Sequence, residues 1–386
     1  MQQRVALVHD FLLDVRGAER VFAALADVYP EADLFTAVYD EKGTEGRFAH
    51  RNVRTSFLQR LRPTARTFRP LLPFYPYAME ALDLSGYDLV VSSSSAWAHG
   101  VIVDPGAVHV CYCHNPFRYA WNARDETLGQ RNVVQRAALG IVFQRWRQWD
   151  WIAAQRVDRY VANSETTRGR IRRYFGRDAD VIYPPVETGR FKPGPVSDFY
   201  VVLSELMPHK RIHQAVEAFN RLRLPLVVVG NGPEARRLRR MAGPTVSFAG
   251  RVSDRRAAEL LSAARALVVT ATEEFGIAAV EAQAAGRPVI ALAEGGVRET
   301  VQGGITGAFY DQPDPAALAE VVARFDALAV DPAACVANAA RFDVTHFRHE
   351  VKRTVDEACA DERPPRADPR RVRPRGLGAR MVAPGA

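Results

Sequence analysis

Short apolar runs alternate with helix-forming segments along the first half of the chain. The runs are rich in β-branched residues, which is typical of buried strands. We expect strands at residues 5–10, 34–39, 89–92 and 108–113, and a further strand followed by a loop over residues 159–164. Helices are expected from Gly17 to about Pro30 and over residues 133–156. This alternation predicts a parallel sheet covered by helices.

The second half repeats the pattern after a proline-rich break. A short apolar run at residues 181–186, which we expect to form a strand, contains Pro184 and Pro185, and two further prolines follow within ten residues. A stiff extended turn of this kind is a natural domain boundary. Apolar runs then predict strands at residues 199–203, 226–230, 246–250, 266–270 and 289–292, and residues 331–360 are predicted to be helical. A chain of 386 residues has room for two such domains.

Composition narrows the class of protein. No apolar run approaches the ~20 residues of a membrane-spanning helix, and the chain opens with a strand rather than a signal peptide, so we expect a cytoplasmic protein. The four cysteines are Cys111, Cys113, Cys335 and Cys359. Their spacing fits neither a zinc site nor a disulfide framework, which favours reduced thiols in the core.

The net charge of +8 is unevenly distributed. Residues 361–386 hold seven arginines against three acidic residues, which accounts for half of the excess. Because this tail has few large apolar residues and many prolines and glycines, we expect it to be disordered.

A second basic segment lies within the first domain. Residues 47–79 hold no Asp or Glu, and their seven arginines are interleaved with aromatic residues and leucines: Arg47, Arg51, Arg54, Arg60, Arg62, Arg66 and Arg69. Such a pattern suits an anionic membrane surface, or an arginine-rich surface that packs over its own core. Nucleic acid is not an expected partner, because no nucleic-acid module accompanies the charges.

The most informative stretch is residues 273–288. An apolar strand precedes it, Gly276 opens an alanine-rich helix, and Gly286 and Pro288 end that helix. A helix N-terminus presents unpaired N–H groups and a partial positive charge, so the amides of Gly276 and Ile277 are candidate anion ligands. Glu273 before the helix and Glu281 within it could hold the hydroxyls of a ligand whose phosphate lies between them. A solvated acidic turn is the alternative.

The order of motifs around this stretch resembles glycosyltransferase family four. The motifs are E-x-F-G at residues 273–276, Glu281 eight positions after Glu273, A-x-A-x-G-x-P-V-I from residue 282, G-G-x-x-E-T at 295–300 and G-x-x-G at 304–307. Members are retaining enzymes with two Rossmann-like domains, the GT-B architecture. The resemblance implies an acceptor-side domain at residues 1–184, a sugar-nucleotide domain at 185–345, a helix at 346–360 that crosses back to the first domain, and the tail.

The resemblance also implies roles for residues of the cleft. Lys210 matches the family's diphosphate lysine and Glu281 its ribose ligand, while Glu273 would hold the donor sugar with Phe275 in the same motif. His114, in a C-H-x-P pattern followed by R-Y-x-W, resembles O-antigen-type mannosyltransferases and would lie near the transferred sugar; a capping or core histidine is the alternative.

Three further features complete the implied site. Gly17 resembles the family's glycine loop, although a simple tight turn has the same pattern. Gly230 and Gly232 resemble the nucleotide-side loop, and Arg251 stands where the base is held. This chain departs from the family pattern at Glu205, where many members carry an arginine. A carboxylate there would repel a diphosphate. Glu205 therefore either points away from the diphosphate or is accompanied by another phosphate-binding residue, such as Arg211.

The implied function is a retaining, metal-independent hexosyltransferase of cell-surface polysaccharide synthesis that needs no cofactor. Its donor would be a nucleoside diphosphate sugar, GDP-mannose in first place, and its acceptor a glycan or lipid-linked glycan at the inner face of the membrane. Two alternatives stay open: a GT-B-fold sugar-nucleotide epimerase, and a non-catalytic sugar-nucleotide-binding protein. No D-x-D-like carboxylate pattern calls for a divalent metal.

Overall fold

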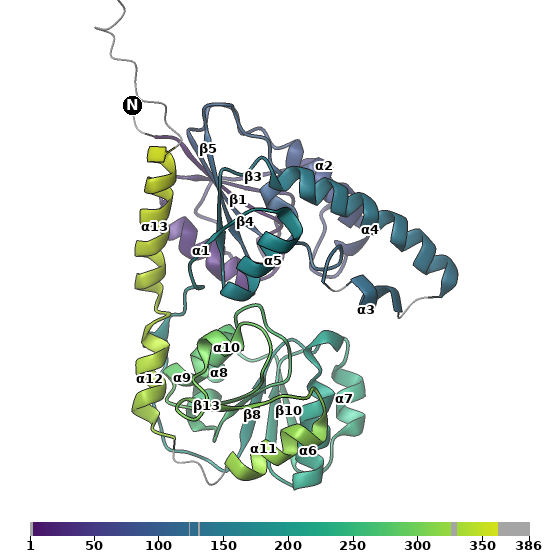
Figure 1. Cartoon of the computed structure of the whole chain (residues 1–386), viewed down its shortest axis with the longest axis vertical. Helices are drawn as coiled ribbons and strands as arrows, with labels where there is room; N and C mark the ends of the chain where they lie inside the picture. The colour runs from purple at the N-terminus through teal and green to yellow at the C-terminus, as the bar shows by residue number, and fades with distance from the viewer. Residues whose placement is uncertain (1–2, 123, 130–131, 326–329, 362–386) are drawn as a thin grey trace, which may run out of the picture.

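The computed structural model describes residues 3–122, 124–129, 132–325 and 330–361 and contains two parallel sheets, each covered by helices (Figure 1). The strands of the first sheet are β1 (Val5–His9), β2 (Asp33–Thr36), β3 (Val53–Thr55), β4 (Leu89–Ser94), β5 (Val108–Cys113), β6 (Arg159–Ala162) and β7 (Asp180–Val181). They lie in the order β3-β2-β1-β4-β5-β6-β7. The two-domain Rossmann-like fold expected from the alternating pattern is confirmed.

The second sheet has the order β10-β9-β8-β11-β12-β13. Its strands are β8 (Tyr200–Leu203), β9 (Leu226–Val229), β10 (Val246–Gly250), β11 (Leu267–Val269), β12 (Val289–Leu292) and β13 (Gly307–Tyr310). In both sheets the order reverses beside the first strand of the domain, β1 or β8. Ligands of open α/β sheets bind beyond the carboxyl ends of the strands at such points.

Helices cover both sheets. Those of the first part are α1 (Gly17–Val28), α2 (Tyr75–Glu80), α3 (Arg124–Gly129), α4 (Val133–Ala154) and α5 (Glu165–Phe175), with short 3-10 helices η1 (Phe57–Leu61), η2 (Arg69–Phe74), η3 (Ala98–Gly100) and η4 (Thr188–Arg190). The second part contains η5 (Pro208–Lys210), α6 (Ile212–Leu222), α7 (Ala235–Met241), α8 (Asp254–Ala263), α9 (Ile277–Ala284), α10 (Val297–Thr300) and α11 (Pro315–Phe325).

The chain crosses between the two sheets twice, and the crossings are hydrogen-bonded to each other. Val186 donates to the carbonyl of Phe342 and accepts from the amide of Val344, both at 3.0 Å. The predicted strand over residues 181–186 is therefore wrong beyond Val181, because the following residues form this crossing. The helical segment expected at 331–360 is broken at the same place into α12 (Pro332–Ala340) and α13 (Val344–Asp361).

α12 lies beside the second domain, whereas α13 lies along the first (Figure 1). Phe347, Val351 and Val355 of α13 are buried in the same cluster as Phe22 and Leu25 of α1. The domain limits given by the sequence stay a prediction. Most of the tail, residues 362–386, lies outside the described residues, so the predicted disorder of the tail stays a prediction.

The four cysteines are buried and free. Among the helices that the structure describes, none combines the length and the hydrophobicity that a membrane crossing requires.

Candidate active site

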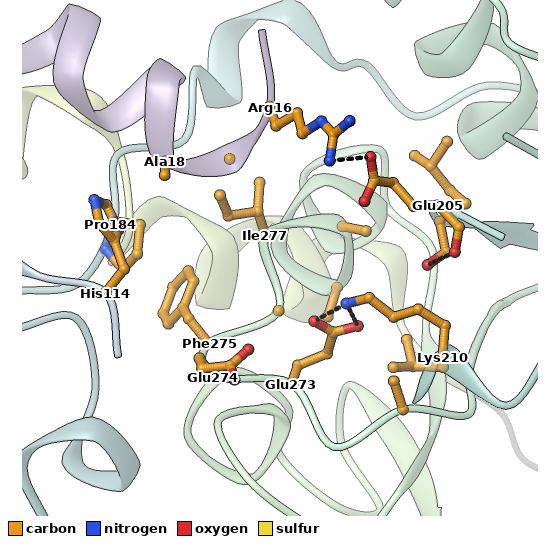
Figure 2. Close-up of a pocket in the computed structure, with 18 of the residues that line it drawn as sticks. Arg16, Ala18, His114, Pro184, Glu205, Lys210, Glu273, Glu274, Phe275 and Ile277 are labelled. Carbon is orange, nitrogen blue, oxygen red and sulfur yellow. Dashed lines mark hydrogen bonds and ion pairs between the residues drawn. The ribbon is translucent and has the colours of Figure 1, made fainter. Parts of the chain in front are cut away.

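A cavity of about 410 Å³ lies between the two sheets at the carboxyl ends of their strands. β1 leads into it through Gly17, β5 through His114, β8 through Glu205 and β11 through Glu273. A larger cavity of about 990 Å³ adjoins it and shares Arg16, Gly17, Glu205 and Ile277 with it. The structure thus brings together residues from both halves of the sequence, as Figure 2 shows for the smaller cavity.

Two helix N-termini face each other across this space. α1 begins at Gly17, and α9 begins at Ile277 after Gly276, whose φ of +96° is favourable only for glycine. A Cβ on Gly17 would lie 3.2 Å from Cδ1 of Ile277, so the side chain of Ile277 reaches the first turn of α1. The first N–H groups of both helices carry partial positive charge, which makes this gap favourable for an anion.

Lys210 and Glu273 form an ion pair on the wall of the smaller cavity. The Lys210 ammonium lies 2.8 and 2.7 Å from the two carboxylate oxygens of Glu273 (Figure 2). The Thr270 hydroxyl donates to the Lys210 carbonyl at 2.7 Å and fixes the turn that carries the lysine. The side chain of Phe275 is buried, and its ring packs against Tyr183 and Phe342. Phe275 therefore packs as a core residue and supports the loop that carries Glu273.

Glu205 points into the cleft and pairs with Arg16 of the opposite domain. The Arg16 guanidinium lies 2.9 Å from the Glu205 carboxylate (Figure 2). Within the described structure, Arg211 lines neither cavity; its guanidinium lies 3.9 Å from Glu294. The cation beside Glu205 is thus Arg16, which sequence analysis did not single out, and not Arg211. Its position next to Gly17 was the one available hint.

His114 is the last member of a buried hydrogen-bonded chain. Nδ1 of His9 lies 2.9 Å from the carbonyl oxygen of Ser93, and a carbonyl only accepts, so His9 carries its proton on Nδ1. The same nitrogen lies 3.1 Å from the Ser93 hydroxyl; because that hydroxyl accepts from His9, its own proton is directed to Nε2 of His114, 2.8 Å away. Burial, with a smaller contribution from His9, lowers the pKa of His114 to about 3. His114 is accordingly neutral, with its remaining proton on Nδ1.

The residues that the resemblance places on the nucleotide side, Gly230, Gly232 and Arg251, line the larger cavity. A Cβ on Gly230 would meet the Ser204 carbonyl, and a Cβ on Gly232 the Leu206 carbonyl, so both glycines allow these loops to pack together. Arg251 extends from the end of β10 toward the first domain and pairs with Asp14 at 3.2 Å and Glu45 at 3.4 Å.

Glu281 is buried at the floor of the larger cavity. Arg20 of α1 lies 3.3 Å from its carboxylate and 2.7 Å from Asp254. Burial raises the pKa of Glu281 above its ordinary value, although Arg20 and Arg190 act in the opposite direction. Arg20 is a second residue that sequence analysis missed.

The loop after His114 reaches the second domain through another pair of charges. Arg170 of α5 donates to Asn115 at 2.8 Å and lies 3.2 Å from Glu274. Burial pushes the pKa of Glu274 up, but Arg118, Lys210 and Arg170 outweigh burial and hold this pKa below its ordinary value. Glu274 is therefore ionised at neutral pH. Nothing in the local sequence separates it from an ordinary acidic turn.

No group of three or more His, Cys, Asp and Glu side chains placed to hold a metal ion occurs among residues 3–122, 124–129, 132–325 and 330–361. The groups of the cleft that carry positive charge are the two helix N-termini and basic side chains.

Comparison with known proteins agrees with this geometry. Residues 15–190 match the family described as Glycosyltransferase Family 4, and residues 189–341 match Glycosyl transferases group 1. Among solved structures, HepE of Anabaena in complex with UDP-glucose has a TM-score of 0.68 at 19% identity and covers 92% of this chain and 99% of its own. Sucrose-phosphate synthase from Thermosynechococcus elongatus has a TM-score of 0.70 at 20% identity, covering 93% and 100%.

Curated relatives match over shorter stretches. A D-inositol 3-phosphate glycosyltransferase of Acidothermus cellulolyticus is 30% identical over 55% of this chain and 56% of its own. A GDP-mannose-dependent alpha-(1-6)-phosphatidylinositol monomannoside mannosyltransferase of Mycobacterium tuberculosis is 33% identical over 42% of this chain and 50% of its own. The chain thus spans about half the length of these curated relatives. Since the two family matches together run from residue 15 to residue 341 and the fold is that of the structural neighbours, the chain is a GT-B protein of the glycosyltransferase family 4 and group 1 type.

Proposed function

We propose that the protein transfers a hexose from a nucleoside diphosphate sugar to a glycan or lipid-linked acceptor, with retention of configuration and without a metal ion. The observation that carries the proposal is the gap between the N-termini of α1 and α9, with Lys210 on its wall and Arg16 at its rim. Fixed positive charges of this kind stabilise a departing diphosphate.

The proposed roles follow from where each side chain lies. Lys210 and the amides of Gly276 and Ile277 would hold the diphosphate, and Arg16 would add the second cation. When the donor enters, Lys210 exchanges part of its ion pair with Glu273 for phosphate oxygens, which frees the Glu273 carboxylate to accept hydrogen bonds from sugar hydroxyls. Glu281 would accept from the ribose, and the Nδ1–H of neutral His114 would donate to a sugar oxygen.

The chemistry of the step is a displacement at the anomeric carbon. The glycosidic C–O bond to the diphosphate breaks, and the acceptor oxygen bonds to the same carbon. The acceptor proton passes to the departing phosphate oxygen, so the attack comes from the face that the leaving group occupies. This route needs no protein nucleophile and no metal, because the diphosphate acts as both leaving group and base.

GDP-mannose is the proposed donor. Support comes from the His114 motif and from the relative in Mycobacterium tuberculosis whose name gives GDP-mannose as its donor. HepE was solved in complex with UDP and with UDP-glucose instead, so UDP-glucose is the competing donor for the experiment. The base would lie in the larger cavity, beside Gly230, Gly232 and Arg251.

The proposed acceptor and location are a lipid-linked glycan at the cytoplasmic leaflet, in cell-surface polysaccharide synthesis. The arginine-rich segment at residues 47–79 supports this less than its sequence suggested. Arg51 donates to the carbonyls of Ala26, Tyr29 and Ala32 within its own domain, and Arg54 pairs with Asp33. Arg47, Arg66 and Arg69 line the larger cavity, which leaves Arg60 and Arg62 as candidates for lipid contact.

The test is incubation with GDP-mannose, UDP-glucose, UDP-galactose and UDP-N-acetylglucosamine, each with and without a polyprenyl-diphosphate-linked glycan. We expect release of GDP from GDP-mannose, stimulated by the acceptor, and an α-linked product by NMR. Lys210→Ala, which removes the diphosphate cation, should abolish release, whereas Lys352→Ala on the outer face of α13 should not. A protein that turns over no donor is not a glycosyltransferase, and a β-linked product excludes retention.

A further inference from the structure

The long helix α4 is apolar on the side that faces solvent as well as on the side that faces the core. Phe143 and Trp146 point inward and join the core cluster of the first domain. Val134, Ile141 and Ile152 are between 56% and 79% exposed. Residues 133–138 are exposed on all sides of the helix, and the later exposed positions recur about every 3.6 residues. They continue one outer face: Val133, Val134, Ala137, Ala138, Ile141, Gln144, Arg145, Gln148, Trp151 and Ile152.

A helix with two apolar faces is normally covered on both. Figure 1 shows α4 extending away from the first sheet, with nothing packed over its outer side in that view. Of the thirteen described large apolar side chains that are exposed, nine fall within residues 57–77 and 133–152. Exposed apolar side chains concentrated in this way mark an interaction surface.

The charges of this helix identify the kind of partner. The sequence contains no Asp or Glu from Thr127 to Trp149, and Arg136 and Arg145 of α4 are exposed. The neighbouring segment η2–α2 packs on the inner side of α4, where Leu71 and Leu72 join the core cluster together with Leu139. That segment is also free of acids until Glu80 and adds exposed Phe74 and Tyr77.

We propose that the outer face of α4 is the surface by which this protein binds an anionic lipid bilayer. Trp, Ile and Val side chains would enter the headgroup region, where an aromatic ring is favourable. Arg145 on this face, and Arg136 in the first turns that are exposed on all sides, would attract anionic lipids. A second copy of the chain fits less well, because pairing two such faces brings arginines together without acidic partners. The inference rests on the membrane location in the proposed function but not on its chemistry.

The position of α4 links this surface to the cleft. The ring of Trp146 packs against Phe117, with centroids 5.2 Å apart, and Asp150 accepts from Nε1 of Trp121 at 2.6 Å. Both partners belong to the segment that follows His114. A bilayer bound at α4 would therefore lie against the element that supports the loop after His114.

The experiment is co-sedimentation of the full chain with vesicles of phosphatidylcholine alone or of equal parts phosphatidylcholine and phosphatidylglycerol. We expect wild type to bind the anionic vesicles and V134Q/I141Q/W151Q/I152Q to lose roughly tenfold or more in affinity, because it keeps every charge and loses only apolar insertion. The matched control is V196Q/I305Q, which changes two exposed apolar residues of the second domain and should bind as wild type.

A second variant isolates the charges. R136Q/R145Q should lose the preference for phosphatidylglycerol and bind both vesicle types equally weakly. Brominated lipid should quench wild-type tryptophan fluorescence, and W151F should remove most of that quenching. Circular dichroism melting curves serve as the check that each variant is folded.

Three outcomes overturn the proposal. Equal binding of the quadruple variant and wild type would assign any membrane affinity to the basic tail or another face. Wild type that ignores anionic vesicles excludes a membrane surface. A wild-type dimer in light scattering that the quadruple variant abolishes, without vesicle binding, assigns the face to a second copy. Donor hydrolysis by the quadruple variant in the absence of vesicles shows separately whether the proposed chemistry stands.

Discussion

Arg16, immediately before α1, lies 2.9 Å from Glu205, two residues after β8, so that a cation of the first domain neutralises an anion of the second. Other charge pairs span the same cleft: Arg20 with Glu281, Arg251 with Asp14, and Arg170 with Glu274. Of these arginines, Arg16 lies at the rim of the proposed diphosphate site, and half of its side chain is exposed. A ligand phosphate can therefore reach it without displacing core residues.

The first prediction concerns this pair. Arg16→Gln should lower the affinity for GDP by ~1.5–3 kcal/mol, because it removes a charge-assisted contact and leaves Glu205 unpaired beside the phosphates. Glu205→Gln should raise the affinity, since Arg16 is then free for phosphate. Isothermal titration calorimetry measures both, and the double variant should recover part of the loss. If Arg16→Gln binds GDP as wild type does, Arg16 is only an interdomain contact.

The second prediction concerns the ribose. Glu281→Ala should weaken binding of the intact sugar nucleotide by ~1.5–3 kcal/mol while changing the free energy of unfolding less. Its carboxylate is buried at the cavity floor, where a lost hydrogen bond to the ligand is not replaced by water. Calorimetry gives the affinity and denaturant titration gives the free energy of unfolding. Glu320→Ala, at an exposed position of α11, is the matched control. Unchanged donor affinity would remove Glu281 from the site.

The third prediction concerns stability in acid. Burial lowers the pKa of His109 and of His114 to about 3, against an ordinary 6.5. Between these pH values the unfolded chain binds more protons than the folded protein, so the free energy of unfolding rises with pH. Each histidine contributes up to ~1.4 kcal/mol per pH unit in that window, and its contribution is constant above pH 6.5.

Denaturant unfolding between pH 4.5 and 6.5 measures that slope. His109→Gln and His114→Gln should each reduce it by about one proton. A slope that His114→Gln does not alter means that burial does not lower the pKa of His114.

The fourth prediction concerns metals. Turnover should persist in excess chelator, because the positive charge of the site comes from helix N-termini, Lys210 and Arg16. A control series with added Mg²⁺ or Mn²⁺ should give the same rate. Loss of turnover on chelation that either ion restores would mean that a metal bridges the diphosphate.

Local sequence determined the elements and much of the pocket wall. The strands at 246–250 and 289–292 have the predicted limits, and α9 begins directly after Gly276, because apolar runs, glycine and proline act over a few residues. The turn before α9, which we propose binds the diphosphate, was predictable for the same reason. The end of β7 and the break before α13 were not, since both depend on hydrogen bonds between two crossings that lie more than 150 residues apart.

Only the tertiary structure decided which charges meet in the cleft. Arg16 and Glu205 are separated by 189 residues, and no periodicity relates them. Likewise, the sequence places His114 at a strand end, but its lowered pKa depends on burial and on His9, and its hydrogen bond on Ser93 from the adjacent strand. The outer face of α4 is apolar by sequence, yet only packing shows which of its two apolar faces the core leaves uncovered. Backbone preferences act locally, whereas burial and charge pairing depend on neighbours that the fold supplies.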